Sequence, residues 1–96
     1  VLAGCDAILC APASGAAPAL ADVDEGPWRR QQPLTAPFNL TGHPAICIPA
    51  GFDAKGLPLS LQLVGRAFDE AMVLRIAHAH EQATEWHTRR PPEDQA

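Results

Sequence analysis

Residues 57–64, Leu-Pro-Leu-Ser-Leu-Gln-Leu-Val, carry the clearest strand pattern of the chain. Its leucines alternate with other residues: Leu59, Leu61 and Leu63 are interleaved with Ser60, Gln62 and Val64. Successive side chains of a β-strand point to opposite faces, so the pattern predicts a strand with one apolar and one mixed face. Gln62 lies on the mixed face. We interpret it as a structural hydrogen-bonding residue, because a buried amide must satisfy its donors and acceptors.

A long helix is predicted directly after this strand, from about Asp69 to Trp86. Asp69 suits the N-cap position, and Glu70 suits the positive end of the helix dipole. Apolar residues recur at helical spacing, namely Met72, Ile76, Ala79, Ala83 and Trp86, with Val73, Ala77 and His80 beside them. This periodicity predicts one broad apolar face that covers the sheet.

Two further strands and a short helix are predicted before residue 57. The runs from Asp6 to Ala11 and from Ala45 to Pro49 are continuous and apolar, which is typical of buried strands. Pro37 to Gly42 is predicted to be helical, because proline is tolerated in a first turn and glycine often ends a helix. Ala50 to Gly56 are interpreted as turn residues. Strand, loop, helix, strand, strand and helix in this order indicate an α/β fold.

The segment between the first strand and the short helix is predicted to be a long loop, residues 12–33. Four prolines and two glycines interrupt any regular pattern there. Trp28 is expected to anchor this loop to a surface. Residues 91–96 are expected to form a frayed tail. The whole chain, residues 1–96, is therefore interpreted as a single segment without a second domain.

Composition and charge argue against several kinds of partner. The formal net charge is -4, and the seven basic residues are scattered, whereas nucleic-acid binding needs clustered Lys and Arg. No apolar stretch approaches the roughly 20 residues that a membrane span requires. We therefore expect no nucleic acid and no membrane among the partners.

The cysteines and histidines do not form the pattern of a metal or disulfide site. Cys5, Cys10 and Cys47 include no CxxC pair, which suits a reducing cytosol and a cytoplasmic protein. Cys10 and Cys47 lie in apolar runs and are expected to be buried, inert thiols. His78 and His80 would point about 200° apart on a helix and cannot share one metal ion. We expect neither a metal nor another cofactor.

Several blocks of the chain resemble the amidase-signature family. Residues 37–52, PFNLTGHPAICIPAGF, are similar to the family's Asn-Leu-x-Gly-x-Pro-Ala block, and residues 56–66, GLPLSLQLVGR, to its next strand. Residues 6–12 resemble the strand that opens the family's C-terminal portion, and residues 68–77 resemble its closing helix. The blocks follow the order of the family, which includes amidases and the A-type subunits of glutamyl-tRNA amidotransferases.

The resemblance implies a large α/β fold with a mixed sheet, to which this chain would contribute about three strands with one short and one long helix. It also implies hydrolysis or transfer at an amide carbonyl, through a Ser nucleophile, a second Ser and a Lys base. In the family these residues lie upstream of the matched portion. Ser14, Ser60 and Lys55 do not match them, so we expect a fragment with no catalytic residue.

The resemblance further implies a substrate-binding role for Thr35, Phe38 and Asn39. In members that bind hydrophobic acyl chains, positions just before the matching Asn form part of the acyl-binding wall. Thr35 and Phe38 would then face the pocket, and Asn39 would help to hold the helix. The alternative is that Phe38 and Leu40 are core residues and that Asn39 caps a turn.

Two functional hypotheses follow from these observations. In the first, the chain is the C-terminal structural and substrate-pocket portion of an amide hydrolase. Its partners would be a small-molecule amide and either the rest of the amidase fold or a second copy. In the second, it is a stand-alone, non-catalytic α/β module that self-associates or binds a small ligand.

Overall fold

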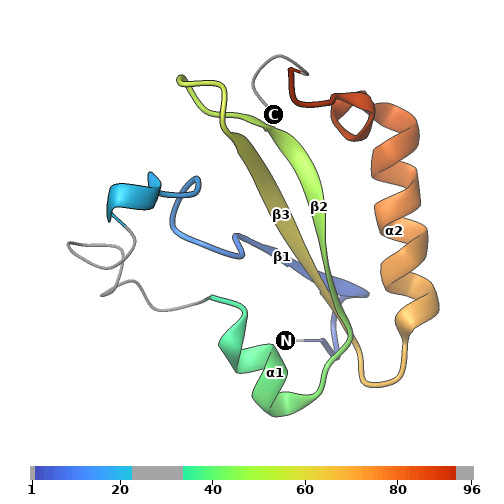
Figure 1. Cartoon of the computed structure of the whole chain (residues 1–96). Helices are drawn as coiled ribbons and strands as arrows, with labels where there is room; N and C mark the ends of the chain where they lie inside the picture. The colour runs from blue at the N-terminus through green and yellow to red at the C-terminus, as the bar shows by residue number, and fades with distance from the viewer. Residues whose placement is uncertain (1, 23–33, 93–96) are drawn as a thin grey trace.

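A three-stranded sheet forms the centre of the computed structural model, which describes residues 2–22 and 34–92. The strands are β1 (Ala7–Cys10), β2 (Ala45–Phe52) and β3 (Pro58–Gly65), and their spatial order is β1-β3-β2. The α-helices are α1 (Ala36–Thr41) and α2 (Glu70–Ala83), and the short 3-10 helices are η1 (Leu20–Asp22) and η3 (Trp86–Thr88) (Figure 1). This order confirms the predicted α/β arrangement. Both strand pairings in the described residues are antiparallel, so the mixed sheet stays an expectation for the larger family fold.

β3 is the central strand, and its register assigns residues to the two faces of the sheet. Directly paired residues of an antiparallel ladder share a face. Gln62 pairs with Cys10 of β1 and with Cys47 of β2, so these three residues form one row. The next row, on the opposite face, contains Leu63 paired with Ile46. The alternation that the sequence predicts for this strand is therefore confirmed.

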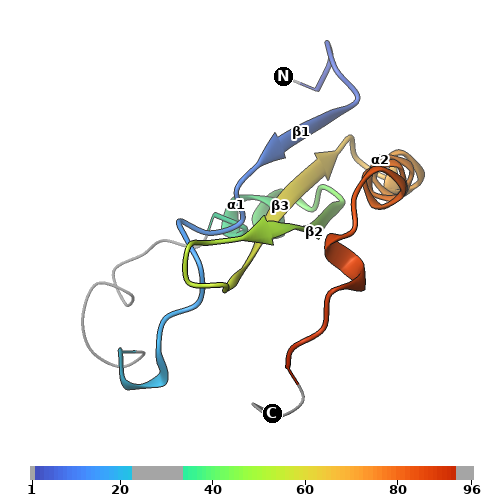
Figure 2. The same cartoon turned by 90° about the horizontal axis from the view of Figure 1, so that it is seen from above.

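α2 covers the face of the sheet that carries the leucines, while α1 lies on the other side (Figure 2). The buried core residues there are Ile48, Leu63, Val73 and Ala77, with Ile46, Leu61 and Ile76 packed against them. A hydrogen bond joins the two layers as well, because His80 Nε2 lies 2.8 Å from the carbonyl oxygen of Pro49. Hydrophobic contact and this bond together hold α2 on β2 and β3.

The apolar face of α2 is confirmed in part, because Met72, Val73, Ile76 and Ala77 are buried or half-buried as predicted. Val73 and Ala77 are its buried residues, whereas Ala79 and Ala83 are exposed. The helix turns the side that carries Val73 and Ala77 toward the sheet, and Ala79 and Ala83 lie away from it. Asp69 precedes the helix as predicted, but its side chain makes no capping hydrogen bond.

α2 also ends earlier than predicted, at Ala83. Thr84 has extended backbone (φ −135°, ψ 170°), and Trp86 lies beyond it in η3. The Trp86 ring makes an edge-to-face contact with Phe52 of β2, with ring centroids 6.1 Å apart. The guanidinium of Arg89 lies 5.9 Å from the Trp86 ring centre. Packing of this indole against β2 therefore replaces the last predicted turn of helix.

β2 continues further than predicted, through Phe52. The register shifts between Pro49 and Gly51, which marks a bulge, and Gly51 has a φ of 130° that favours glycine. The turn begins only at Asp53, whose Oδ1 accepts two backbone N–H groups, each at 2.9 Å. The first half of the predicted turn at 50–56 is therefore wrong, because its glycine serves a bulge.

Two predictions of burial are wrong as well. Leu9 is 62% exposed, because β1 is an edge strand and α2 lies over β2 and β3. Cys47 is exposed and Cys10 is half-buried, since both lie on the face of the sheet opposite α2. An apolar run in the sequence predicts a strand, but it does not show which face of that strand a helix covers.

α1 confirms the predicted short helix almost residue for residue. Pro37 lies in its first turn. Gly42 ends it in the left-handed region (φ 77°), and the Gly42 N–H donates to the carbonyl oxygen of Phe38 at 3.0 Å.

The start of the chain is tied to the end of β3 by Arg66. Its Nε donates to the carbonyl oxygen of Leu2 at 3.0 Å, and its Nη2 donates to that of Cys5 at 2.8 Å. Its Nη1 lies 3.6 Å from Asp6 Oδ1. These contacts hold the segment that leads into β1.

Trp28 and residues 23–33, half of the predicted loop at 12–33, lie outside the described residues, as do residues 93–96, so those expectations stay predictions. Among the helices that the structure describes, none has the length and apolar character to span a membrane.

Replacement of Gly65 by alanine should destabilise the fold. A Cβ at this position would lie 2.5 Å from Val73 Cγ2, inside the buried core. Overpacking of this kind costs about 1–3 kcal/mol in the free energy of unfolding, which denaturant titration measures. The cost should shrink in a Val73→Ala background.

Gly15→Ala is the matched control, because nothing lies within 4 Å of a Cβ there. If Gly65→Ala proved as stable as Gly15→Ala, the close approach of α2 to β3 would be contradicted.

Candidate functional site

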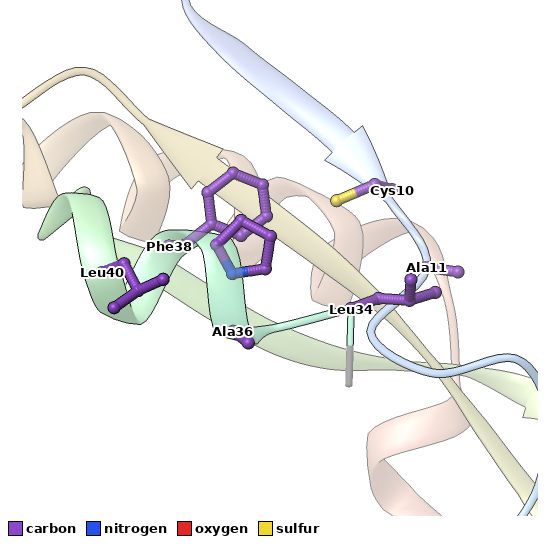
Figure 3. A pocket seen from close by; sticks show the side chains of 7 residues that line it. Cys10, Ala11, Leu34, Ala36, Phe38 and Leu40 are labelled. Atoms are coloured by element: carbon purple, nitrogen blue, oxygen red, sulfur yellow. The ribbon is translucent and has the colours of Figure 1, made fainter. Parts of the chain in front are cut away.

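An apolar hollow of about 650 Å³ lies between the end of β1 and α1 (Figure 3). Its lining residues are Cys10, Ala11, Leu34, Ala36, Pro37, Phe38 and Leu40. Apart from the thiol of Cys10, all of these side chains are hydrocarbon. The hollow lies on the face of the sheet opposite α2, and its size falls within the roughly 300–1,000 Å³ of small-molecule sites.

Of the three residues predicted to bind substrate, Phe38 lines this hollow. Thr35 is half-buried at the start of α1, where its carbonyl oxygen accepts the N–H groups of Phe38 at 3.3 Å and Asn39 at 3.4 Å. Asn39 is exposed and is not among the lining residues. The structure therefore brings Phe38 into the hollow, keeps Thr35 at the helix start and leaves Asn39 outside.

Leu40 corrects the alternative interpretation of this segment. It is 89% exposed and lies at the rim of the hollow, so it is not a core residue. Ala36 and Leu40 are four residues apart on α1 and both line the hollow, a spacing that could have been recognised in the sequence. Cys10 and Leu34 carried no such signal, because they reach the site only through tertiary contacts.

Gln62 lies at the base of this arrangement. Its side chain is 1% exposed, and Nε2 is 3.4 Å from both Cys10 Sγ and the carbonyl oxygen of Leu34. Both partners belong to residues that line the hollow. The interpretation of Gln62 as a structural hydrogen-bonding residue is therefore confirmed.

A second, smaller hollow of about 450 Å³ brings together the two serines considered in the sequence. Ser14 and Ser60 both line it, between residues 11–17 and the start of β3. No His, Lys, Asp or Glu is among its lining residues. Lys55 lies instead in the turn between β2 and β3. A Ser hydroxyl is a weak nucleophile without a base in hydrogen-bond reach, so this hollow offers no hydrolytic centre.

The potential metal ligands of the described residues are dispersed. Within 2–22 and 34–92, no group of three or more His, Cys, Asp or Glu side chains is placed to hold a metal ion. His80 uses its ring nitrogen to contact Pro49 of β2, and His78 is exposed on α2.

The described residues thus form an α/β segment with an apolar hollow beside α1. The amidase family model matches residues 1–74, more than half of the chain, and the chain therefore belongs to the amidase family. The resemblance inferred from the sequence blocks is confirmed.

Curated relatives support the same assignment. A Mycobacterium bovis protein named "Putative amidase AmiD" is 57% identical over 58 residues, which are 60% of this chain and 12% of that protein. A Halalkalibacterium halodurans protein, named as the A-type subunit of glutamyl-tRNA(Gln) amidotransferase, is 62% identical over 58 residues, with the same two coverages. The chain therefore spans a small part of the length of these relatives. No solved structure gives a significant match.

Proposed function

We propose that this chain supplies the apolar acyl-binding wall of an amide hydrolase. The observation that carries the proposal is the hydrocarbon lining of the hollow beside α1, in a chain that belongs to the amidase family. Burial of apolar ligand surface stabilises a complex by about 25 cal/mol per Å². Such a wall favours amides whose acyl group is a ring or an alkyl chain over amides with a charged acyl group.

Phe38 would be the main contact with the acyl group. Its half-buried ring lines the hollow from α1, while Thr35 supports the first turn through its carbonyl oxygen. Asn39 would act from the outer side of this helix, by holding it rather than by touching the acyl group. The relatives include one protein named as an amidase and one named as part of an amidotransferase, and the two activities share attack at an amide carbonyl.

Catalysis would come from outside this chain. The described serines lack a neighbouring base, and in the resembled family the Ser-Ser-Lys residues precede the portion that this chain matches. The chain would then act as one C-terminal segment, cytoplasmic and without a cofactor, within a larger amidase fold.

Several large hydrophobic side chains are exposed on the surface of the described residues, where the rest of a larger fold could cover them. Phe68, in the turn between β3 and α2, is 93% exposed and has a φ of 60°, which bulky residues rarely adopt. Leu9 on the β1 edge and Leu74 on α2 are exposed as well. We propose that such side chains are covered by the rest of an amidase fold, or by a second copy in its absence.

Benzamide should bind to the hollow, and Phe38→Ala should weaken this binding. Loss of the ring contact is expected to raise the dissociation constant about tenfold, measured by amide chemical shifts during titration. Leu20→Ala is the matched control, because Leu20 is exposed and does not line the hollow. Equal affinities for the wild type and Phe38→Ala would contradict the assignment of Phe38.

A serine-directed fluorophosphonate probe should leave the protein unlabelled, because no base activates Ser14 or Ser60. Intact-mass spectrometry after incubation measures the result. Stoichiometric labelling at either serine would contradict the non-catalytic part of the proposal.

The protein should self-associate as its concentration rises, and Phe68→Asp should weaken that association, as measured by sedimentation velocity. Leu20→Asp is the control, because Leu20 is equally exposed at 93% but lies in η1. A protein that stays monomeric at high concentration would contradict the proposed surface.

A further inference from the structure

The two walls of the apolar hollow come from distant parts of the chain. Cys10 and Ala11 form one wall at the end of β1, whereas Leu34 and Phe38 belong to the other, at and just before α1. In Figure 3 the sulfur of Cys10 points from its strand toward the side where Phe38 lies. The width of the hollow therefore depends on what holds these segments at their distance.

The side chain of Gln62 contacts both walls. Gln62 Nε2 lies 3.4 Å from Cys10 Sγ on one wall and 3.4 Å from the carbonyl oxygen of Leu34 on the other. A carboxamide nitrogen carries two hydrogens, so it can donate to both partners at once. The carbonyl of Leu34 can only accept, which requires the nitrogen and not the oxygen of the amide to face it.

Gln62 is held rigidly, because it lies in the central strand of the sheet and is buried. It lies in β3, which pairs with β1 on one side and with β2 on the other. At 1% exposure its side chain has almost no access to water, so solvent cannot replace a lost partner. Hydrogen bonds to β1 and β2 hold the backbone at Gln62. Through its contact with the carbonyl oxygen of Leu34, the carboxamide also holds the segment that leads into α1.

We infer that Gln62 is a positioning residue that couples the two walls of the hollow and so sets its fit to the acyl group. The identity of the ligand rests on the proposed function. The coupling of the walls is a property of the fold and can be measured without any ligand.

Gln62→Met tests the coupling, because methionine has a similar length but no donor. The amide protons of Phe38 and Gly42, which are hydrogen-bonded in α1, should exchange at least about tenfold faster. Exchange at Val73 in α2 should stay unchanged, and the dissociation constant for benzamide should rise about tenfold. Gln82→Met is the matched control, because Gln82 is exposed on α2.

Gln62→Glu separates positioning from a loss of packing. A protonated carboxyl has one O–H donor, whereas the ionised form has none. Burial disfavours the carboxylate, so the protonated carboxyl should be populated at pH 5, and its single O–H can donate to the carbonyl oxygen of Leu34 but not also to Cys10 Sγ. Protection of the α1 amides and affinity for benzamide should therefore recover in part in Gln62→Glu at pH 5 relative to pH 8. Neither quantity should depend on pH in this way in Gln62→Met. If Gln62→Met fails to fold, the wild type serves as the pH-independent reference for Gln62→Glu.

The outcomes distinguish the two proposals. Unchanged α1 exchange in Gln62→Met, or an absence of pH-dependent recovery in Gln62→Glu, would overturn the coupling. Failure of the wild-type protein to bind benzamide would contradict the proposed function, and the exchange data would then decide the coupling alone.

Discussion

Every residue of β3 must point to one of two faces, because a strand has a side-chain period of two. Leu61 and Leu63 point to α2 and form the core with it, while Gln62 and Val64 point to the opposite face. A slip of one residue in register would move the carboxamide of Gln62 into the apolar core. The antiparallel ladders on both sides of β3 prevent this slip, so one strand fixes both the core and the floor of the hollow.

The face of the sheet that α2 covers and the face beside α1 are packed differently. On one face Gly65 allows Val73 to approach closely, and α2 excludes water from the leucines. On the other face α1 is short and leaves a hollow beside Phe38 rather than filling the space with side chains. The α2 face therefore carries the cluster of buried aliphatic residues, and the α1 face carries the hollow that we propose binds a ligand.

Local chemistry explains what could be predicted from the sequence. Pro37 and Gly42 mark the ends of α1 through constraints on their own backbone, and the alternation in β3 needs no knowledge of its partners. Exposure of Leu9 could not be predicted in this way, because it depends on the order of strands in the sheet. The predicted place of Ala79 on the covered helix face was wrong for a related reason, since spacing does not show which side of a helix meets the sheet.

In the candidate site, too, some residues could be predicted from the sequence, whereas others depend on tertiary packing. The family resemblance predicts that Phe38 faces a pocket, whereas Cys10 and Leu34, which line the hollow with it, come close to it only through tertiary packing. The sequence indicated that Gln62 would be hydrogen-bonded, yet its partners lie 52 and 28 residues away along the chain. Contacts at such separations leave no periodic signal.

Nuclear Overhauser effects at β3 test the division of the two faces most directly. We predict cross-peaks from the side-chain amide protons of Gln62 to Cys10 and Leu34, and from the methyl groups of Leu63 to Val73 and Ala77. Cross-peaks from the Gln62 amide protons to Val73 or Ala77 would place the carboxamide beneath α2. That result would contradict the register, the hollow and the function proposed for it.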